Sequence, residues 1–244
     1  MPEQLSFTVL LNHLFAAPVT RVLTALHVPP AYPAAPITNT VAMEILVTLI
    51  LLVFFMAVRA SIKVENPGPV QHIAEMLHGF VSSQSESIIG HGYERFVPFL
   101  TVVGIFILLA NMLGLVPGFE SPTASPVVPL GLALLTFVYY NFYGFKENGP
   151  VGYAKQFVGP VWWMAPLLFP IEIISHLARI LSLTVRLYAN MFAGDLVTLA
   201  FFSLVPIAIP VVFLGLHFGV ALIQAYVFMV LGMIYLSQAV AHEH

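Results

Sequence analysis

Charged and polar side chains recur within a long apolar stretch near the carboxyl-terminal end of the chain. Residues 170–206 are mostly apolar, and their polar members are Glu172, Ser175, His176, Arg179, Ser182, Arg186, Asn190 and Asp195. Inside a membrane a charged side chain is costly, and by default it marks an ion path or a proton relay. These residue types could therefore pass a proton or another small cation across a bilayer.

The spacing of these residues places most of them on one face of a helix. Seven residues at ~100° each return to within ~20° of the starting direction. The side chains that lie within about 40° of Arg186 by this count are Glu172, Ser175, Arg179, Ser182 and Asn190. Asp195 lies ~180° from Arg186, on the opposite face. The pattern predicts a polar stripe about five turns long, with one acid facing away from it.

Arg186 needs a partner from outside its own helix. No acid lies three or four residues from it, and an arginine stays charged in any protein environment. The other members of the stripe have a structural alternative: Arg179 could pair with Glu172 or Ser175, and His176 could simply hydrogen-bond a neighbouring helix. Arg186 is therefore the strongest candidate for a functional charge.

The last apolar stretch supplies His217 and Gln224, which are seven residues apart and share a face, with Gln238 two further heptads along. A histidine titrates near neutral pH, so His217 next to Asp195 would form a plausible proton relay. Gln224 could hydrogen-bond across to the stripe around Arg186. Its alternative role is that of a hydrogen-bonding contact between two membrane helices.

Composition requires that lipid covers most of the chain. Its 244 residues are 59% hydrophobic and only 8% charged, whereas a soluble domain has about 25% charged residues. The net charge of −3 gives no basic face for nucleic acid. Cysteine is absent, which excludes disulfides, thiolate metal sites and iron–sulfur clusters. The tail His242-Glu243-His244 could bind a metal, but a solvated end is the simpler interpretation.

We expect an all-α integral membrane protein with about five spanning helices. The expected spans are 41–58, 96–116, 126–145, 165–205 and 208–241, which together form a channel domain over 41–244. Residues 1–40 form an external segment. A surface helix over about 69–90 is expected, because its apolar residues follow the i, i+3, i+4, i+7 rule with polar residues between them. The alternative is a short soluble helix packed on a neighbouring subunit.

The last two spans are too long for a perpendicular crossing. Residues 170–206 contain no internal proline and would extend ~52 Å, whereas the hydrocarbon core is ~30 Å thick. A straight helix of this length would tilt by ~55°, beyond the usual 0–40°. We therefore expect two steeply tilted helices joined by a turn at 206–210. A break near Gly194 is the alternative.

Basic residues predict the orientation of the chain. Arg59, Lys63 and Arg95 fall in the 59–95 connection and Lys146 and Lys155 in the 146–160 loop. The connections at 117–125 and 205–210 contain no basic residue. By the positive-inside rule, the carboxyl terminus is cytoplasmic and the amino terminus lies outside. Without a signal or transit pattern at the amino terminus, a bacterial plasma membrane is favoured over an organelle inner membrane.

Two segments resemble the a subunit of F-type ATP synthases. They are LSLTVRLYANMFAGDL at 181–196 and QAYVFMVLGMIYLSQA at 224–239, and the stretch from Asn111 to Pro117 matches as well. The resemblance covers most of 95–241. Tyr188-Ala189 stands where the family usually has Phe-Gly, so contact with the rotor is expected to differ slightly there. Asp195 stands where a Glu is often found.

The resemblance implies a stationary, non-catalytic ion-channel subunit without a cofactor, which couples proton flow to ATP synthesis. Its partners would be a rotating ring of small hairpin subunits, a peripheral-stalk membrane subunit, the rest of the complex and lipid. The ring carboxylates would meet two half-channels separated by Arg186. The implied ion-translocation residues are Arg186, Asp195, His217, Glu172, Gln224, Asn190, His176, Ser182 and Arg179, with Asp195 and His217 in the outer half-channel and Glu172, His176 and Ser182 near the inner one.

Three other classes fit the sequence less well. A secondary transporter would show two related halves with broken helices, and neither is present. An intramembrane hydrolase would need a nucleophile motif such as Gly-x-Ser-x-Gly or a His-Glu-x-x-His site, and the chain has neither. Membrane subunits of respiratory proton pumps usually have Lys and Glu on broken helices, whereas the expected spans here contain no Lys.

Overall fold

The chain is built from helices. The computed structural model describes residues 4–28, 30, 32–63, 67–116, 118–158, 165–204 and 208–240. Every regular element in these ranges is helical: α1 (Ser6–Ala25), α2 (Asn39–Ser61), α3 (Pro69–Ile89), η1 (Tyr93–Arg95), α4 (Val97–Leu113), η2 (Pro122–Ala124), α5 (Val127–Val158), α6 (Ala165–Leu204) and α7 (Ala208–Val240). The all-α prediction is confirmed. The expected turn at 206–210 lies partly outside the described residues, and the tail 242–244 lies wholly outside them.

Five of these helices are long and apolar enough to cross a membrane. They are Ser6–Ala25, Asn39–Ser61, Val127–Gly149, Ala165–Phe201 and Val211–Val240, and Val97–Leu113 is a shorter apolar helix. Large apolar side chains face outward along them: Val53 is 60% exposed, Val138 63% and Leu181 64%. Soluble proteins rarely expose apolar surface of this extent to water, so lipid must cover these helices. The protein is an integral membrane protein, as its composition predicts.

Local sequence signals set the ends of α2 and α3. The Thr38 hydroxyl accepts a hydrogen bond from the backbone N–H of Val41 (3.4 Å) and caps the first turn of α2. Arg59 lies in the last turn of α2, where a positive charge interacts favourably with the helix dipole. α3 begins at Pro69 and ends at Gly90, which has a φ of 79°.

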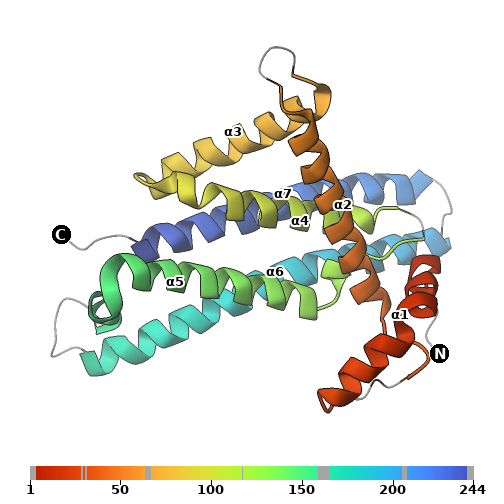
Figure 1. The fold of residues 1–244 in the computed structure, drawn as a ribbon, viewed down its shortest axis with the longest axis horizontal. Helices are drawn as coiled ribbons and strands as arrows, with labels where there is room; N and C mark the ends of the chain where they lie inside the picture. Colours follow the sequence, from red (N-terminus) through yellow and green to blue (C-terminus); the bar gives the residue numbers. More distant parts are fainter. Residues whose placement is uncertain are drawn as a thin grey trace.

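The helix α3 packs along α4 and α7, and Figure 1 shows it lying beside α4. Val81 and Ser85 face this contact and are buried. Ile73 and Met76 face outward, with exposures of 52% and 75%. The helix therefore has an apolar outer face as well as a packed inner one, which agrees with the expected surface helix. Its position relative to a bilayer stays a prediction.

The helix α5 extends beyond its predicted end. A polar loop was expected over 146–160, but the helix continues through Lys146 and bends at Gly149, whose φ of 68° is in the left-handed region that glycine tolerates. The chain then forms a second helical segment to Val158. Tyr153 of that segment is buried, and its hydroxyl donates to the Asn141 side-chain carbonyl (2.8 Å). The loop prediction is wrong over 146–158, because the glycine redirects the helix without ending helical structure.

The last two helices are long and continuous. α6 has 40 residues and α7 has 33, which at 1.5 Å per residue gives ~60 and ~50 Å. α6 runs through Gly194 without interruption, so the alternative of a break there is excluded. Figure 1 shows α6 and α7 extending roughly alongside each other, with α2 crossing their direction at a steep angle. If α2 crosses the bilayer directly, the other two would lie steeply tilted; their tilt stays a prediction.

The helix α7 is the centre of the molecule, and α6 lies at its edge. α7 packs against α3, α4, α5 and α6. Its buried residues Ala221, Ala225 and Phe228 meet Leu183 and Leu187 of α6 in one apolar cluster. Only one side of α6 takes part in this packing. Its other side is left open, and the polar residues predicted from the sequence must be placed relative to these two sides.

The helix α1 packs against the beginning of α2. Leu11 and Met43 are buried together in this contact. The Asn12 side chain fixes the connection, because it donates to the Ile37 carbonyl and accepts from the Ile37 N–H (both 3.0 Å). The segment 1–40, expected to be external, thus contains a helix that is long and apolar enough to enter a membrane. Its external location stays a prediction.

Candidate functional site

Arg186 projects from the open side of α6. Leu183, Leu187 and Met191 recur at four-residue intervals on the opposite side, and all three are buried against α7. Ser182, by contrast, is exposed together with Arg186. The division follows from helix geometry, in which residues four apart lie on the same face. The middle of the predicted polar stripe therefore faces out of the molecule.

The guanidinium of Arg186 makes one short contact with the described part of the chain. Its Nη2 donates to the Ser182 hydroxyl at 3.3 Å. No ion pair joins it to an acid within the described residues. A guanidinium has five N–H donors and a permanent charge, so a single serine leaves most of this capacity unused. The observed geometry agrees with the expectation that its partner comes from elsewhere.

Asn190 links the stripe to the last helix. Its amide nitrogen donates to Oε1 of Gln224 at 2.8 Å. Gln224 is buried, and its Nε2 has no hydrogen-bond partner within the described residues. The predicted reach of Gln224 towards the stripe is therefore seen, through Asn190 instead of through Arg186. Gln238 is exposed near the end of α7.

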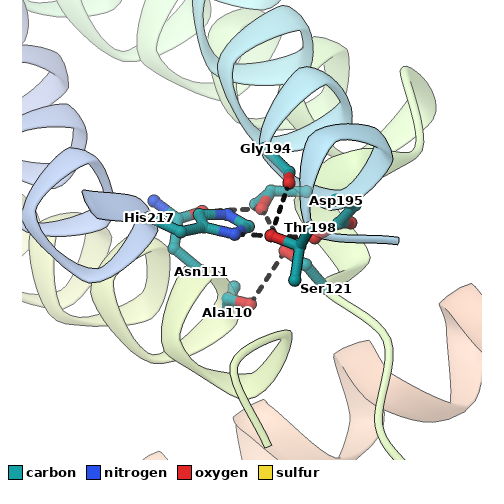
Figure 2. Close-up of polar contacts among 8 residues, drawn as sticks. Ala110, Asn111, Ser121, Gly194, Asp195, Thr198 and His217 are labelled. Atoms are coloured by element: carbon teal, nitrogen blue, oxygen red, sulfur yellow. Dashed lines mark hydrogen bonds and ion pairs between the residues drawn. The ribbon is translucent and has the colours of Figure 1, made fainter. Parts of the chain in front are cut away.

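Asp195 and His217 lie together, as the sequence predicts. Nδ1 of His217 is 3.8 Å from Oδ1 of Asp195, and the histidine side chain is only 4% exposed. Figure 2 shows the imidazole extending from α7 towards Gly194, Asp195 and Thr198 of α6. A Cβ atom at Gly194 would stand 3.0 Å from two ring atoms of His217. The glycine therefore provides the space that the imidazole occupies.

A cavity of about 270 Å³ lies between α6 and α7 beside this pair. Its lining includes Asn190, Gly194, Thr198 and His217. Liquid water takes about 30 Å³ per molecule, so the cavity has room for several waters. Nε2 of His217 is buried and has no partner within the described residues. The cavity therefore extends from Asn190 to the imidazole of His217.

Buried hydroxyl and amide groups from another part of the chain lie next to the pair (Figure 2). Thr123 Oγ1 donates to Asn111 Oδ1 (2.6 Å), Ser121 Oγ lies 2.7 Å from Thr123 Oγ1, and Asn111 Nδ2 donates to the Ala221 carbonyl on α7 (3.4 Å). All three side chains are buried. This cluster attaches the α4–α5 connection to the helix that presents His217.

Glu120 lies beside this cluster at the surface. Its Oε1 accepts from the Asn39 side chain (3.3 Å). The sequence did not single out Glu120, Ser121 or Thr123. Their contacts join segments that are far apart in the chain, and no spacing rule relates such positions.

A second polar cluster lies in the amino-terminal half of α6. Nε2 of His176 is 3.5 Å from Oε1 of Glu172, and Nδ1 is 2.7 Å from the Tyr140 hydroxyl of α5. Arg179 places its guanidinium 5.0 Å from the ring centre of Tyr235, a cation–π contact. Arg179 forms no ion pair with Glu172 within the described residues, so that structural alternative is not what the structure shows. The contact between His176 and Tyr140 is the hydrogen bond to a neighbouring helix that the sequence analysis gave as the alternative for His176, although the sequence did not identify Tyr140 as the partner.

The two polar clusters lie on either side of Arg186 along α6. By helix rise, His176 is ~15 Å and Asp195 ~14 Å from the level of Arg186. The described residues contain no group of three or more His, Cys, Asp or Glu placed to hold a metal ion. The arrangement consists of two clusters that can exchange protons and one exposed fixed cation between them.

Comparisons with known proteins place these residues in a family context. The family model described as ATP synthase A chain matches residues 41–237. The chain is 59% identical to ATP synthase subunit a of Koribacter versatilis (strain Ellin345), over 100% of both sequences. It is 47% identical to that of Solibacter usitatus (strain Ellin6076) over 86% of this chain and 91% of the relative. Identity to that of Helicobacter pylori (strain P12) is 41%, over 78% and 84%.

Proposed function

Because the chain belongs to the ATP synthase A chain family, we propose how its residues conduct protons in the stationary channel subunit of an F-type ATP synthase. The chain is a multi-pass membrane protein, and its relatives named above are bacterial, which indicates a bacterial inner membrane. We assign it no catalytic step of its own: it guides protons, and the chemistry of ATP synthesis belongs to other subunits of the complex.

The open side of α6 is proposed to face a rotating ring of small subunits that each have one membrane carboxylate. The small side chains of Ala178, Ala189 and Ala193 are exposed on α6. Small residues let a neighbouring membrane helix approach closely. Arg186 on the same helix has no acidic partner in the described chain, and a ring carboxylate would supply one. A peripheral-stalk membrane subunit is the other proposed contact.

The outer half-channel is assigned to the cluster around His217. A proton would enter past Asp195 and His217 and cross the cavity towards Asn190 and Gln224. The support is the 3.8 Å contact between Asp195 and His217, and the cavity that joins them to Asn190. From there the proton would neutralise a ring carboxylate, which could then turn into lipid at modest cost.

The inner half-channel is assigned to the cluster around His176. A carboxylate that has completed nearly a full turn would lose its proton near Ser182. The proton would pass His176 and Glu172 on its way to the cytoplasm, and Arg179 would provide positive charge beside them. The contact between Glu172 and His176 supports this path. The orientation, with a cytoplasmic carboxyl terminus and an external amino terminus, follows from the basic loops.

Arg186 is proposed to keep the two half-channels apart. Its fixed positive charge attracts each ionised ring carboxylate and repels a proton that would cross directly between the clusters. A lysine would serve less well, because its pKa falls readily on burial. The driving force is ~2.3 kcal/mol per charge per 100 mV, plus any pH difference. The observation on which the assignment rests is an exposed Arg186 between two polar clusters.

The test is Arg186→Ala in inverted membrane vesicles, measured by proton-driven ATP synthesis and passive proton permeability. We expect the complex to assemble, synthesis to be lost and the membrane to leak protons. Arg59→Ala is the control, because it also removes an exposed arginine and should leave synthesis near the wild-type rate. Synthesis by Arg186→Ala near the wild-type rate would refute the assignment.

A further inference from the structure

The hydroxyl of Tyr140 contacts the imidazole of His176. Tyr140 is 1% exposed, and its hydroxyl lies 2.7 Å from Nδ1 of His176. On the basis of the proposed function, we propose that Tyr140 is a positioning residue of the inner half-channel. It holds His176 in the tautomer that directs an Nε2–H towards Glu172.

The contacts of the two imidazole nitrogens favour this tautomer. An ionised carboxylate can only accept, so the 3.5 Å contact between Nε2 and Glu172 favours a proton on Nε2. In a neutral imidazole the other nitrogen is then an acceptor. Nδ1 of His176 therefore needs a donor, and the Tyr140 hydroxyl is the group within 2.7 Å of it.

The surroundings of Tyr140 leave its own proton available for His176. The positive charge of Arg179 lies near enough to act on the Tyr140 hydroxyl. A guanidinium has donors and no acceptor, so Arg179 cannot take the proton of Tyr140. The O–H of Tyr140 can therefore point at Nδ1.

Packing from three helices fixes the two rings relative to each other. The rings of Tyr140 and His176 are stacked, with centroids 5.8 Å apart and planes at 18°. Phe137 of α5 meets the imidazole edge-on at 6.0 Å, and Tyr235 of α7 lies 5.9 Å from Tyr140. In such a close-packed site, rotation of either ring would need its neighbours to move. The imidazole keeps one orientation.

Several titratable or charged groups face this pair, and they must stay unchanged in a test. On α6 these are Glu172 and Arg179, which act directly on His176. On α5 Tyr153 acts on Tyr140, and on α7 Tyr235 contacts the ring. Tyr140→Phe removes one hydroxyl and leaves these four neighbouring residues unchanged.

The experiment is ATP synthesis by the whole complex carrying Tyr140→Phe in inverted vesicles, where the cytoplasmic side faces the medium. The rate of ATP synthesis is first recorded against medium pH at a fixed lumen pH. It is then recorded against lumen pH at a fixed medium pH. The lost hydrogen bond is one that only the neutral imidazole accepts. The medium-side profile should therefore move to higher pH by about half to one unit, and the lumen-side profile should not change.

Tyr143→Phe is the matched control, because Tyr143 lies one turn along α5 and its ring packs on Phe96 and Tyr139. Both of its profiles should match the wild type. In a His176→Ala background, Tyr140→Phe should cause no further shift. If Tyr140→Phe does not assemble, 3-fluorotyrosine at Tyr140 keeps the shape and strengthens the donor, and should move the medium-side profile to lower pH.

An unchanged medium-side profile in Tyr140→Phe would overturn the role of Tyr140. If only the fluorotyrosine protein assembles, an unchanged medium-side profile in that protein would do the same. A shift caused by Tyr140→Phe in the His176→Ala background would also overturn it. These results are independent of the Arg186→Ala test. Should Arg186→Ala lose coupling while the Tyr140 variants behave like the wild type, only the inference about Tyr140 fails. Should Arg186→Ala retain coupling, the proposed function itself fails.

Discussion

Gly194 shows how one residue without a side chain can position another that titrates. The imidazole of His217 occupies the space beside α6 that a Cβ at position 194 would need. The ring is buried there. One of its nitrogens lies near Asp195, and the ring lines the cavity between α6 and α7. Interiors pack densely, so a displacement of a few tenths of an ångström would alter the distance from His217 to Asp195.

We predict that Gly194→Ala slows proton-driven ATP synthesis without preventing assembly. The added methyl would lie 3.0 Å from the imidazole, so His217 must move, and overpacking of this kind costs about 1–3 kcal/mol. If half of that cost falls on proton transfer, the rate drops roughly 2- to 13-fold. The measurement is synthesis rate per assembled complex in inverted vesicles.

Gly215→Ala is the control for this substitution, because a Cβ there meets nothing within 4 Å. It lies on α7 close to His217 and should preserve the wild-type rate. Equal rates for both variants would mean that the close approach at Gly194 has no bearing on proton transfer.

At the residue scale, the sequence predicted the groups that share a helix and the meeting of Asp195 with His217, but it missed Tyr140. The count of ~100° per residue was enough to place Arg186 with Ser182 and Asn190. Tyr140 was missed because its relation to His176 depends on how α5 and α6 pack. Spacing along one helix contains no information about that packing.

At the element scale, α6 has two different sides. One side meets α7 through leucine and methionine, and the other combines small side chains near Arg186 with large apolar ones such as Leu181 and Phe192. A helix that were simply anchored in lipid would have no need for small residues on its outer side. The asymmetry indicates a helix whose open side is meant for close contact with a partner.

We predict that Ala189→Trp separates this subunit from the ring. Ala189 is exposed on the open side of α6, three residues past Arg186, and an indole there would hold a neighbouring helix away. The expected result is an inserted subunit that co-purifies poorly with the ring and no longer couples ATP hydrolysis to proton pumping. Co-purification from mild detergent and ATP-driven acidification of vesicles measure both effects.

Val138→Trp is the control for bulk in a lipid-facing position. Val138 is 63% exposed on α5, and tryptophan there should leave co-purification and pumping intact. Normal co-purification of Ala189→Trp would show that the ring does not contact this side of α6.

The boundaries of elements were predictable where proline or glycine ends a helix, and failed where glycine redirects one. Pro69 and Gly90 delimit α3 as expected. Gly149 lies inside the loop expected over 146–160, yet the chain resumes a helix on its far side. Tyr153 stabilises that segment through contacts with earlier parts of α5, and such contacts only exist once the chain has folded.

At the scale of the whole molecule, α7 holds the helices together and α6 forms an edge. The apolar clusters that include α7 draw on α3, α4, α5 and α6. This arrangement lets one face of α6 remain open while the helix itself is held firmly from behind. The open side of α6 is thereby accessible to a partner along its length. The two polar clusters lie at fixed positions along this helix.

The predicted orientation can be checked with single cysteines, because the natural chain has none. Lys63→Cys lies in the basic connection after α2, and Phe119→Cys lies in the connection before α5. A membrane-impermeant maleimide should label Lys63→Cys in inverted vesicles and Phe119→Cys in right-side-out vesicles. Both side chains are exposed, so labelling of the two from the same side would contradict the orientation.

The single serine contact of Arg186 also bears on how the protein is made and kept in the cell. A newly inserted chain, alone in lipid, would present a full positive charge that Ser182 cannot neutralise. Insertion of an arginine at the centre of a membrane helix costs about 2.5–3.5 kcal/mol. An orphan subunit should therefore be short-lived, because an uncompensated charge in the bilayer gives membrane proteases a signal that the mature complex conceals. If a ring carboxylate is the partner of Arg186, as proposed, the lifetime of the subunit should increase when the ring is present.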